Sequence, residues 1–199
     1  MTDHKRAEGP PATEARLRLG LADEAATVEL GTRLAATIVP GLKIYLHGDL
    51  GAGKTTLSRA LLKGLGHAGR VKSPTYTLVE VYDLSRLNLY HFDFYRFRDA
   101  QEWREAGFSD YFGGDDVCLV EWPERVGDDL PSPDLDIFIA MVGGADGMAT
   151  STDDEPRADI IARGTGGTEE RRAEIIARTA KGQRCVASLT ASYSHASSS

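Results

Sequence analysis

Residues 48–55 of the chain read Gly48-Asp49-Leu50-Gly51-Ala52-Gly53-Lys54-Thr55, which is the complete G-x-x-x-x-G-K-T pattern of a phosphate-binding loop. The apolar segment 42–47 before this loop predicts a buried strand, and leucines and alanines at helical spacing predict a helix over residues 55–65. The glycines allow successive backbone N–H groups to point at phosphate oxygens, and the start of the helix adds positive potential. The sequence therefore predicts a nucleotide-binding site, called the P-loop below.

The P-loop also indicates how a nucleotide is held. Lys54 is expected to reach the β- and γ-phosphates, Thr55 to place its hydroxyl on Mg²⁺, and Thr56 to lie beside the phosphates. The expected contacts of the loop with the nucleotide are Asp49, Leu50, Gly51, Ala52, Gly53, Lys54, Thr55 and Thr56. Asn88 is the single asparagine of the chain, so the Asn-Lys-x-Asp sequence that reads guanine in GTPases is absent. ATP is therefore favoured as the nucleotide.

The rest of the chain is expected to complete one α/β domain. Asp23 is a suitable N-cap for a helix that ends at Pro40-Gly41, and the stretches 77–82 and 87–94 suit an antiparallel pair. Further elements are expected as a helix over 100–105, strands over 117–121, 135–142 and 158–162, a loop over 143–154 and a closing helix over 169–181. The predicted fold class is α/β, a single P-loop NTPase domain with a mixed, mostly parallel sheet flanked by helices. The predicted division is a disordered leader over 1–20, the ATPase domain over 21–183 and a Ser-rich disordered tail over 184–199.

Composition narrows the classes of function. The formal net charge of −7 argues against general binding to nucleic acid, although it leaves room for a local basic patch, so any link to RNA is expected to be indirect. The sequence has neither an apolar run long enough for a membrane span nor a signal-peptide pattern, so we expect a cytoplasmic protein without membrane contact. Cys118 and Cys185 lack the spacing of a zinc site and are expected to be reduced thiols.

Two acids end apolar strands at positions where they could serve a P-loop. Asp93 follows Leu89-Tyr90-His91-Phe92, and Glu121 follows Val117-Cys118-Leu119-Val120. A carboxylate at the end of a buried strand can hold Mg²⁺ or orient the attacking water. Strand position alone leaves open which acid has which task, and either could also be a surface acid at a strand end.

Four segments together resemble one family. They are GDLGAGKTT at 48–56, VKSPTYTLVE at 71–80, YHFDFYR at 90–96 and LVEWP at 119–123. In this order, and across about residues 23–139, they resemble the TsaE family, the ATPases of bacterial tRNA threonylcarbamoyladenosine biosynthesis. The resemblance implies a P-loop fold and a role in modifying the adenosine beside the anticodon of tRNAs that read codons beginning with A. It also implies a partner, the TsaD–TsaB transferase complex.

The resemblance further implies tasks for individual residues. It assigns Mg²⁺ coordination to Thr55 and Glu121, the placing of water to Asp93, and a position near the adenine to Glu24 and Thr27. Trp122 would be a neighbour of the site, and residues 73–77 would form a switch-like loop. The catalytic residues implied are Lys54, Asp93 and Glu121.

The expected activity is Mg²⁺-dependent ATP hydrolysis, weak in the chain alone and stimulated by partner proteins. Two alternatives use the same loop. A small-molecule kinase would need an acceptor pocket and an arginine-rich lid, for which the sequence shows no segment. A nucleotide-gated binding module with negligible hydrolysis fits the residue types almost as well. His47 and His91, which lie within apolar strands, are expected to be core histidines with satisfied hydrogen bonds.

Overall fold

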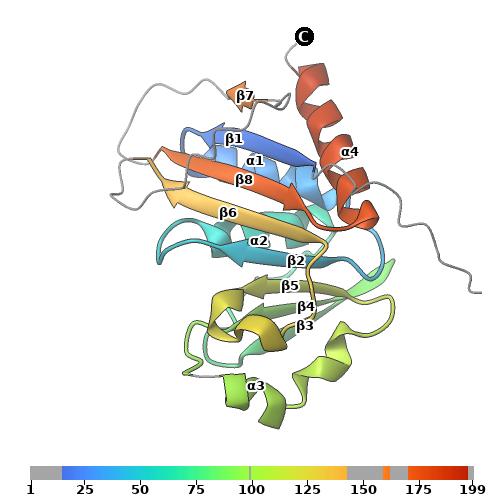
Figure 1. The fold of residues 1–199 in the computed structure, drawn as a ribbon. Helices are drawn as coiled ribbons and strands as arrows, with labels where there is room; N and C mark the ends of the chain where they lie inside the picture. The colour runs from blue at the N-terminus through green and yellow to red at the C-terminus, as the bar shows by residue number, and fades with distance from the viewer. Residues whose placement is uncertain (1–14, 99, 143–158, 162–169, 197–199) are drawn as a thin grey trace, which may run out of the picture.

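A mixed sheet of eight strands runs through the computed structural model, which describes residues 15–98, 100–142, 159–161 and 170–196 (Figure 1). The strands are β1 (Arg16–Leu21), β2 (Lys43–His47), β3 (Val79–Leu84), β4 (Leu87–Asp93), β5 (Val117–Glu121), β6 (Leu135–Met141), β7 (Asp159–Ile161) and β8 (Arg171–Ala177). Their order in the sheet is β3-β4-β5-β2-β6-β8-β1-β7. The pairs β4–β5, β5–β2, β2–β6 and β1–β7 are parallel, whereas β3–β4, β6–β8 and β8–β1 are antiparallel. The predicted mixed, mostly parallel sheet is confirmed.

Four α-helices accompany this sheet in the described residues. They are α1 (Glu24–Ala35), α2 (Lys54–Gly64), α3 (Ala100–Glu105) and α4 (Ala180–Ala196), with short 3₁₀ turns η1 (Phe108–Phe112), η2 (Pro123–Arg125) and η3 (Gly127–Asp129). Asp23 caps α1 as predicted, because its carboxylate accepts a hydrogen bond of 2.8 Å from the Ala26 N–H. None of the helices described here is long and apolar enough to cross a membrane.

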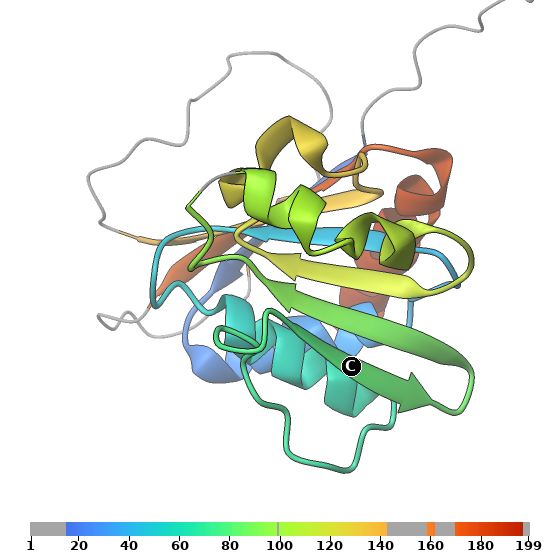
Figure 2. The ribbon, with the colours of Figure 1, turned by 90° about the horizontal axis from the view of Figure 1, so that it is seen from below.

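The two faces of the sheet carry different cores. Helices α1, α2 and α4 cover one face with mainly aliphatic side chains, and α3 with η1 covers the other with aromatic ones (Figure 2). Strand β5 lies between these cores, with Val117 and Leu119 facing the first and Cys118 and Val120 facing the second. This two-sided burial explains why residues 117–121 read as a continuous apolar run.

A close contact between α1 and α2 positions α1 next to the P-loop. A Cβ at Gly31 of α1 would lie 2.6 Å from the Ala60 Cβ and 2.7 Å from the Leu57 carbonyl oxygen of α2. Only glycine permits this approach. The contact holds the buried Thr27 of α1 beside the P-loop, where its methyl group is 3.6 Å from the place of a Cβ on Gly53.

The predicted leader over residues 1–20 is wrong at its C-terminal end. Residues 16–20 belong to β1, which pairs with β8 and buries the alternating Leu17, Leu19 and Leu21. The period of two in these leucines is a strand signal. Residues 1–14 and the predicted loop over 143–154 lie outside the described residues.

The predicted closing helix over 169–181 and the predicted tail over 184–199 are also wrong. Residues 171–177 form β8, because they pair with both β6 and β1 and bury Ala173, Ile175 and Ala177 in the aliphatic core. Helix α4 then runs through most of the predicted tail. It packs on the sheet through buried side chains at helical spacing, which are Cys185, Val186, Leu189 and Tyr193. Residues 197–199 lie outside the described residues.

Candidate nucleotide-binding site

The P-loop joins the end of β2 to the start of α2 in a backbone shape that requires glycine. Gly48, Gly51 and Gly53 have φ values of +134°, +83° and +111°, which L-residues rarely adopt. A Cβ on Gly48 would also lie 2.1 Å from the carbonyl oxygen of Ile139 in β6. The loop thus curls away from the sheet and enters α2 at Lys54, as a phosphate cradle at a helix N-terminus must.

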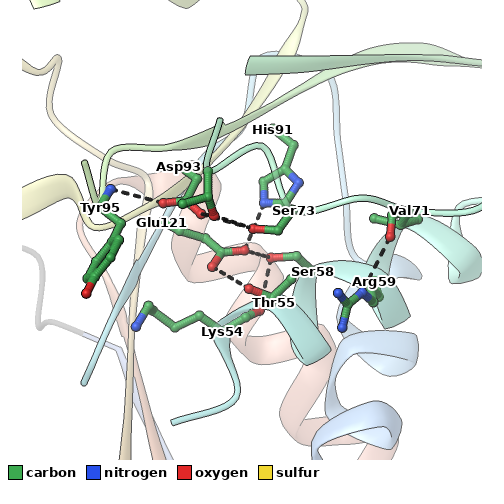
Figure 3. Close-up of polar contacts among 11 residues, drawn as sticks. Lys54, Thr55, Ser58, Arg59, Val71, Ser73, His91, Asp93, Tyr95 and Glu121 are labelled. Atoms are coloured by element: carbon green, nitrogen blue, oxygen red, sulfur yellow. Dashed lines mark hydrogen bonds and ion pairs between the residues drawn. The ribbon is translucent and has the colours of Figure 1, made fainter. Parts of the chain in front are cut away.

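Glu121, at the end of β5, lies beside the first turn of α2, next to Thr55 and Ser58 (Figure 3). Its Oε2 accepts a hydrogen bond of 2.9 Å from the Thr55 hydroxyl, and its Oε1 accepts one of 2.9 Å from the Ser58 hydroxyl and one of 2.9 Å from His91 Nε2. Burial would raise the pKa of Glu121, but the hydrogen bond and charge of His91, with the two hydroxyl donors, lower it. Glu121 is therefore a buried carboxylate held in its charged form against the P-loop threonine.

Asp93 stands next to Glu121, because β4 and β5 are parallel and the two residues are register partners. Its Oδ2 accepts hydrogen bonds from the hydroxyls of Ser73 at 3.0 Å and Thr75 at 2.5 Å, and its Oδ1 accepts one of 3.0 Å from the Tyr95 N–H. The two predicted acids therefore lie together at one edge of the sheet. They differ in their partners, since Glu121 contacts the P-loop helix and Asp93 contacts the segment 73–77.

Lys54 is folded back onto its own loop. Its ammonium donates hydrogen bonds to the carbonyl oxygens of Gly48 and Asp49, at 2.5 and 2.9 Å, and lies 3.7 Å from the centre of the Trp122 ring. Burial lowers the pKa of Lys54, against the raising effect of the surrounding carboxylates. Trp122 itself has a left-handed backbone, with φ of +61°, a conformation that a large side chain seldom adopts. The ring and the loop carbonyls thus satisfy a largely desolvated ammonium.

The remaining predicted contacts lie around this centre. Thr27 is buried beside the P-loop, whereas Glu24 is exposed in the first turn of α1. At the tip of the loop Asp49, Leu50 and Gly51 are exposed, and Ala52 is buried. Thr56 follows Thr55 on α2 and is partly exposed.

Two residues at the centre were missed as site residues. His91 is fully buried, as expected of a core histidine, and its Nε2 pairs with Glu121, but its Nδ1 has no hydrogen-bond partner among the described residues, so the predicted satisfied histidine is only half right. Its position two residues before Asp93 on the same strand is the signal that it faces the same side. Ser58 lies three residues after Thr55 on α2, a spacing that puts both hydroxyls on one helical face.

His47, directly before the P-loop, belongs to a separate charged cluster. Its Nε2 lies 2.7 Å from Asp136 Oδ1 and its Nδ1 lies 3.7 Å from a carboxylate oxygen of Glu124, while its ring stacks on Phe138. Burial would lower the pKa of His47, but the hydrogen bonds to Asp136 and Glu124 raise it. The predicted satisfied histidine is confirmed, although its ring is partly exposed.

Comparison with known proteins identifies the family of this chain. Residues 21–145 match the family described as threonylcarbamoyl adenosine biosynthesis protein TsaE. The chain belongs to the TsaE family. This membership confirms the resemblance found from the four sequence segments and agrees with a nucleotide-binding P-loop protein.

Individual TsaE relatives agree with that assignment. The chain is 46% identical over 118 residues to the tRNA threonylcarbamoyladenosine biosynthesis protein TsaE of Haemophilus influenzae, an alignment that covers 57% of this chain and 75% of the relative. It is 42% identical over 118 residues to the TsaE protein of Bacillus subtilis, covering 59% of this chain and 73% of the relative. The crystal structure of YdiB from Bacillus subtilis is similar with a TM-score of 0.66 and 27% identity, over 90% of this chain and 97% of YdiB.

Proposed function

We propose that this TsaE protein hydrolyses Mg·ATP in support of tRNA threonylcarbamoylation. The modified position is the adenosine next to the anticodon in tRNAs that read codons beginning with A. The observation that supports hydrolysis best is the hydrogen bond of 2.9 Å between the Thr55 hydroxyl and the buried Glu121 carboxylate. Hydroxyl and carboxylate oxygens are the ligands that Mg²⁺ prefers, so the two side chains fit the ion that accompanies ATP in P-loop enzymes.

The residues of the site have distinct tasks in this proposal. Thr55 and Glu121 hold Mg²⁺, which neutralises phosphate charge when it is bound. Lys54 leaves the carbonyls of its own loop and neutralises the β- and γ-phosphates together with the backbone N–H groups of the P-loop. Asp93 orients the attacking water and accepts its proton. Thr27 and Glu24 border the adenine.

The hydrogen bonds of Asp93 support weak turnover in the chain alone. Its Oδ2 already accepts hydrogen bonds from Ser73 and Thr75, so a water molecule competes with these hydroxyls for the carboxylate. We propose that the TsaD–TsaB complex accelerates hydrolysis by moving the segment 73–77. Two large side chains at the mouth of the site are exposed enough to meet such a partner, since Leu50 is 74% exposed and Tyr76 is 82% exposed.

The test is phosphate release from Mg·ATP by the purified chain, first alone and then with TsaD, TsaB and tRNA. A low basal rate that rises with the partners is expected. Lys54→Ala should reduce the stimulated rate on the order of 100-fold, because a preorganised positive group at the phosphates is lost. Arg184→Ala, an exposed change on α4, serves as the control and should leave the rate unchanged.

Two outcomes would contradict the proposal. A Lys54→Ala protein that hydrolyses ATP at the full rate would remove the assigned task of the P-loop lysine. Tight ATP binding without phosphate release, alone and with the partners, would instead favour the nucleotide-gated binding module.

A further inference from the structure

A basic pocket lies along α2, apart from the P-loop. It has a volume of about 590 Å³ and is lined by two residues of α2 and by the segment that follows the helix. The lining residues are Arg59, Lys63, Ala68, Gly69, Arg70, Val71, Lys72 and Ser73. In Figure 3, Arg59 and Val71 lie on the far side of Ser58 from Lys54, so this pocket is separate from the phosphate cradle.

The pocket gathers four cations. Arg59, Lys63, Arg70 and Lys72 are all exposed, and none of the lining residues is acidic. Within the described part of the chain, none of the four takes part in an ion pair. The hydrogen bond of Arg59 to the Val71 carbonyl oxygen is long, at 3.5 Å. Lys63 follows Arg59 by one helical turn, so these two charges are neighbours and repel each other.

This concentration of positive charge is unexpected in a chain with a net charge of −7. Like charges that share a concave surface destabilise the folded state unless an anion joins them. The pocket therefore has the properties of a binding site for an anionic ligand.

We propose that this pocket binds the backbone phosphates of an RNA strand. The choice of RNA rests on the proposed function in tRNA modification, and the choice of phosphate rests on the lining. Lysine is depleted at protein–protein interfaces, which depend on aromatic and other apolar anchors, whereas lysine and arginine together are typical of phosphate contacts. Among the lining residues only Ala68 and Val71 have apolar side chains, and Val71 is buried. The pocket is thus better suited to backbone phosphates than to an acidic protein segment.

The pocket also borders the candidate catalytic centre. Ser73 lines the pocket, and its hydroxyl donates the hydrogen bond of 3.0 Å to Asp93. A strand bound in the pocket would therefore contact the segment that controls the Asp93 carboxylate. The contact with tRNA is then direct, in contrast to the indirect link expected from the overall acidic composition.

The experiment measures binding of a fluorescently labelled tRNA transcript to the full chain, without nucleotide, between 50 and 200 mM salt. Each phosphate contact lowers the logarithmic affinity by about 0.7–0.9 per logarithm of salt, so four contacts predict a slope of about −2.8 to −3.6. This slope corresponds to a loss of affinity of about 50- to 150-fold across the salt range. Because ATP is absent, the result is independent of whether the protein hydrolyses ATP.

Matched variants assign the binding to the pocket. Lys63→Gln/Arg70→Gln removes two of the four charges and should reduce the slope to about half. Arg172→Gln/Arg184→Gln removes two exposed charges of β8 and α4 and should leave the slope unchanged. The charge-preserving variant Lys63→Arg/Arg70→Lys should bind as the unchanged protein does, which separates loss of charge from loss of folding.

Three results would overturn the proposal. The first is the lack of tRNA binding that depends on the pocket, seen either as no binding at 50 mM salt or as binding that both double Gln variants weaken equally. The second is displacement of tRNA by millimolar inorganic phosphate alone, which would identify a small phosphate ligand. The third is binding of poly-glutamate that depends on Lys63 and Arg70 while tRNA binding does not, which would identify an acidic protein segment.

Discussion

Replacing Trp122 by leucine should strengthen nucleotide binding. In the structure the Lys54 ammonium lies 3.7 Å from the centre of the Trp122 ring, and Lys54 as a whole is only 5% exposed. A desolvated cation–π contact of this kind stabilises by about 2 kcal/mol, and an exposed one by about 0.5–1 kcal/mol. If Lys54 turns to the phosphates of a bound nucleotide, this contact must break first. Its energy is therefore subtracted from the binding energy of the nucleotide.

The size of the effect follows from that energy. Removing a contact of about 1–2 kcal/mol from the free state should raise affinity about 5- to 30-fold. Leucine keeps a Cβ, so the left-handed backbone of residue 122 is equally unfavourable before and after the change. Trp122→Phe retains a weaker ring contact, so its nucleotide affinity should lie between those of the unchanged protein and of Trp122→Leu.

The assay is calorimetric titration with a non-hydrolysable ATP analogue and Mg²⁺. A double-mutant cycle with Lys54→Ala isolates the pair, because Trp122→Leu should have no effect on affinity once the ammonium is gone. Weaker binding by Trp122→Leu would refute the reasoning, since it would mean that the ring contacts the nucleotide. An equal gain in the Lys54→Ala background would refute it as well.

Two further predictions concern stability. His47→Gln should cost more stability at pH 6 than at pH 8.5 in urea unfolding, because hydrogen bonds to Asp136 and Glu124 raise the pKa of His47 in the fold. The resulting stabilisation is fully present below the unfolded pKa of about 6.5 and disappears as the pH rises through the folded pKa. An equal loss of stability at pH 6 and pH 8.5 would contradict this prediction. Gly31→Ala should lower the free energy of unfolding by about 1 kcal/mol, because overpacking against Ala60 at 2.6 Å outweighs the better helix propensity of alanine. A gain in the urea midpoint would show that α1 and α2 separate without cost.

The P-loop region could be predicted from the sequence because its local signals agree. Residues 42–66 combine an apolar strand, glycines where the backbone needs positive φ, and a helix with one apolar face. The acids Asp93 and Glu121 could be placed at one edge because each ends an apolar strand. Their separate partners could not, since the contacts of Glu121 with His91 and Ser58 depend on the packing of β4 and α2 around β5.

The C-terminal region could not be predicted, because tertiary packing decides it. Residues 171–177 contain arginine, glutamate and alanine, which favour helices. They nevertheless form β8, because they pair with both β6 and β1 in the sheet. In α4, serines and threonines surround the few apolar residues that reach the core, so composition resembles a disordered tail. The buried side chains of that helix show their pattern only once its partner surface is known.

The position of β8 between β6 and β1 has a consequence for protein synthesis. Among the described strands, β1 has only later partners, because it pairs with β7 and β8, and the contact between Arg18 and Glu174 spans 156 positions. At about 5–20 residues per second, a ribosome needs roughly 8–30 s to extend the chain over that distance. Leu17, Leu19 and Leu21 therefore emerge on the nascent chain without their native strand partners, and this part of the sheet can form only after β8 has been synthesised.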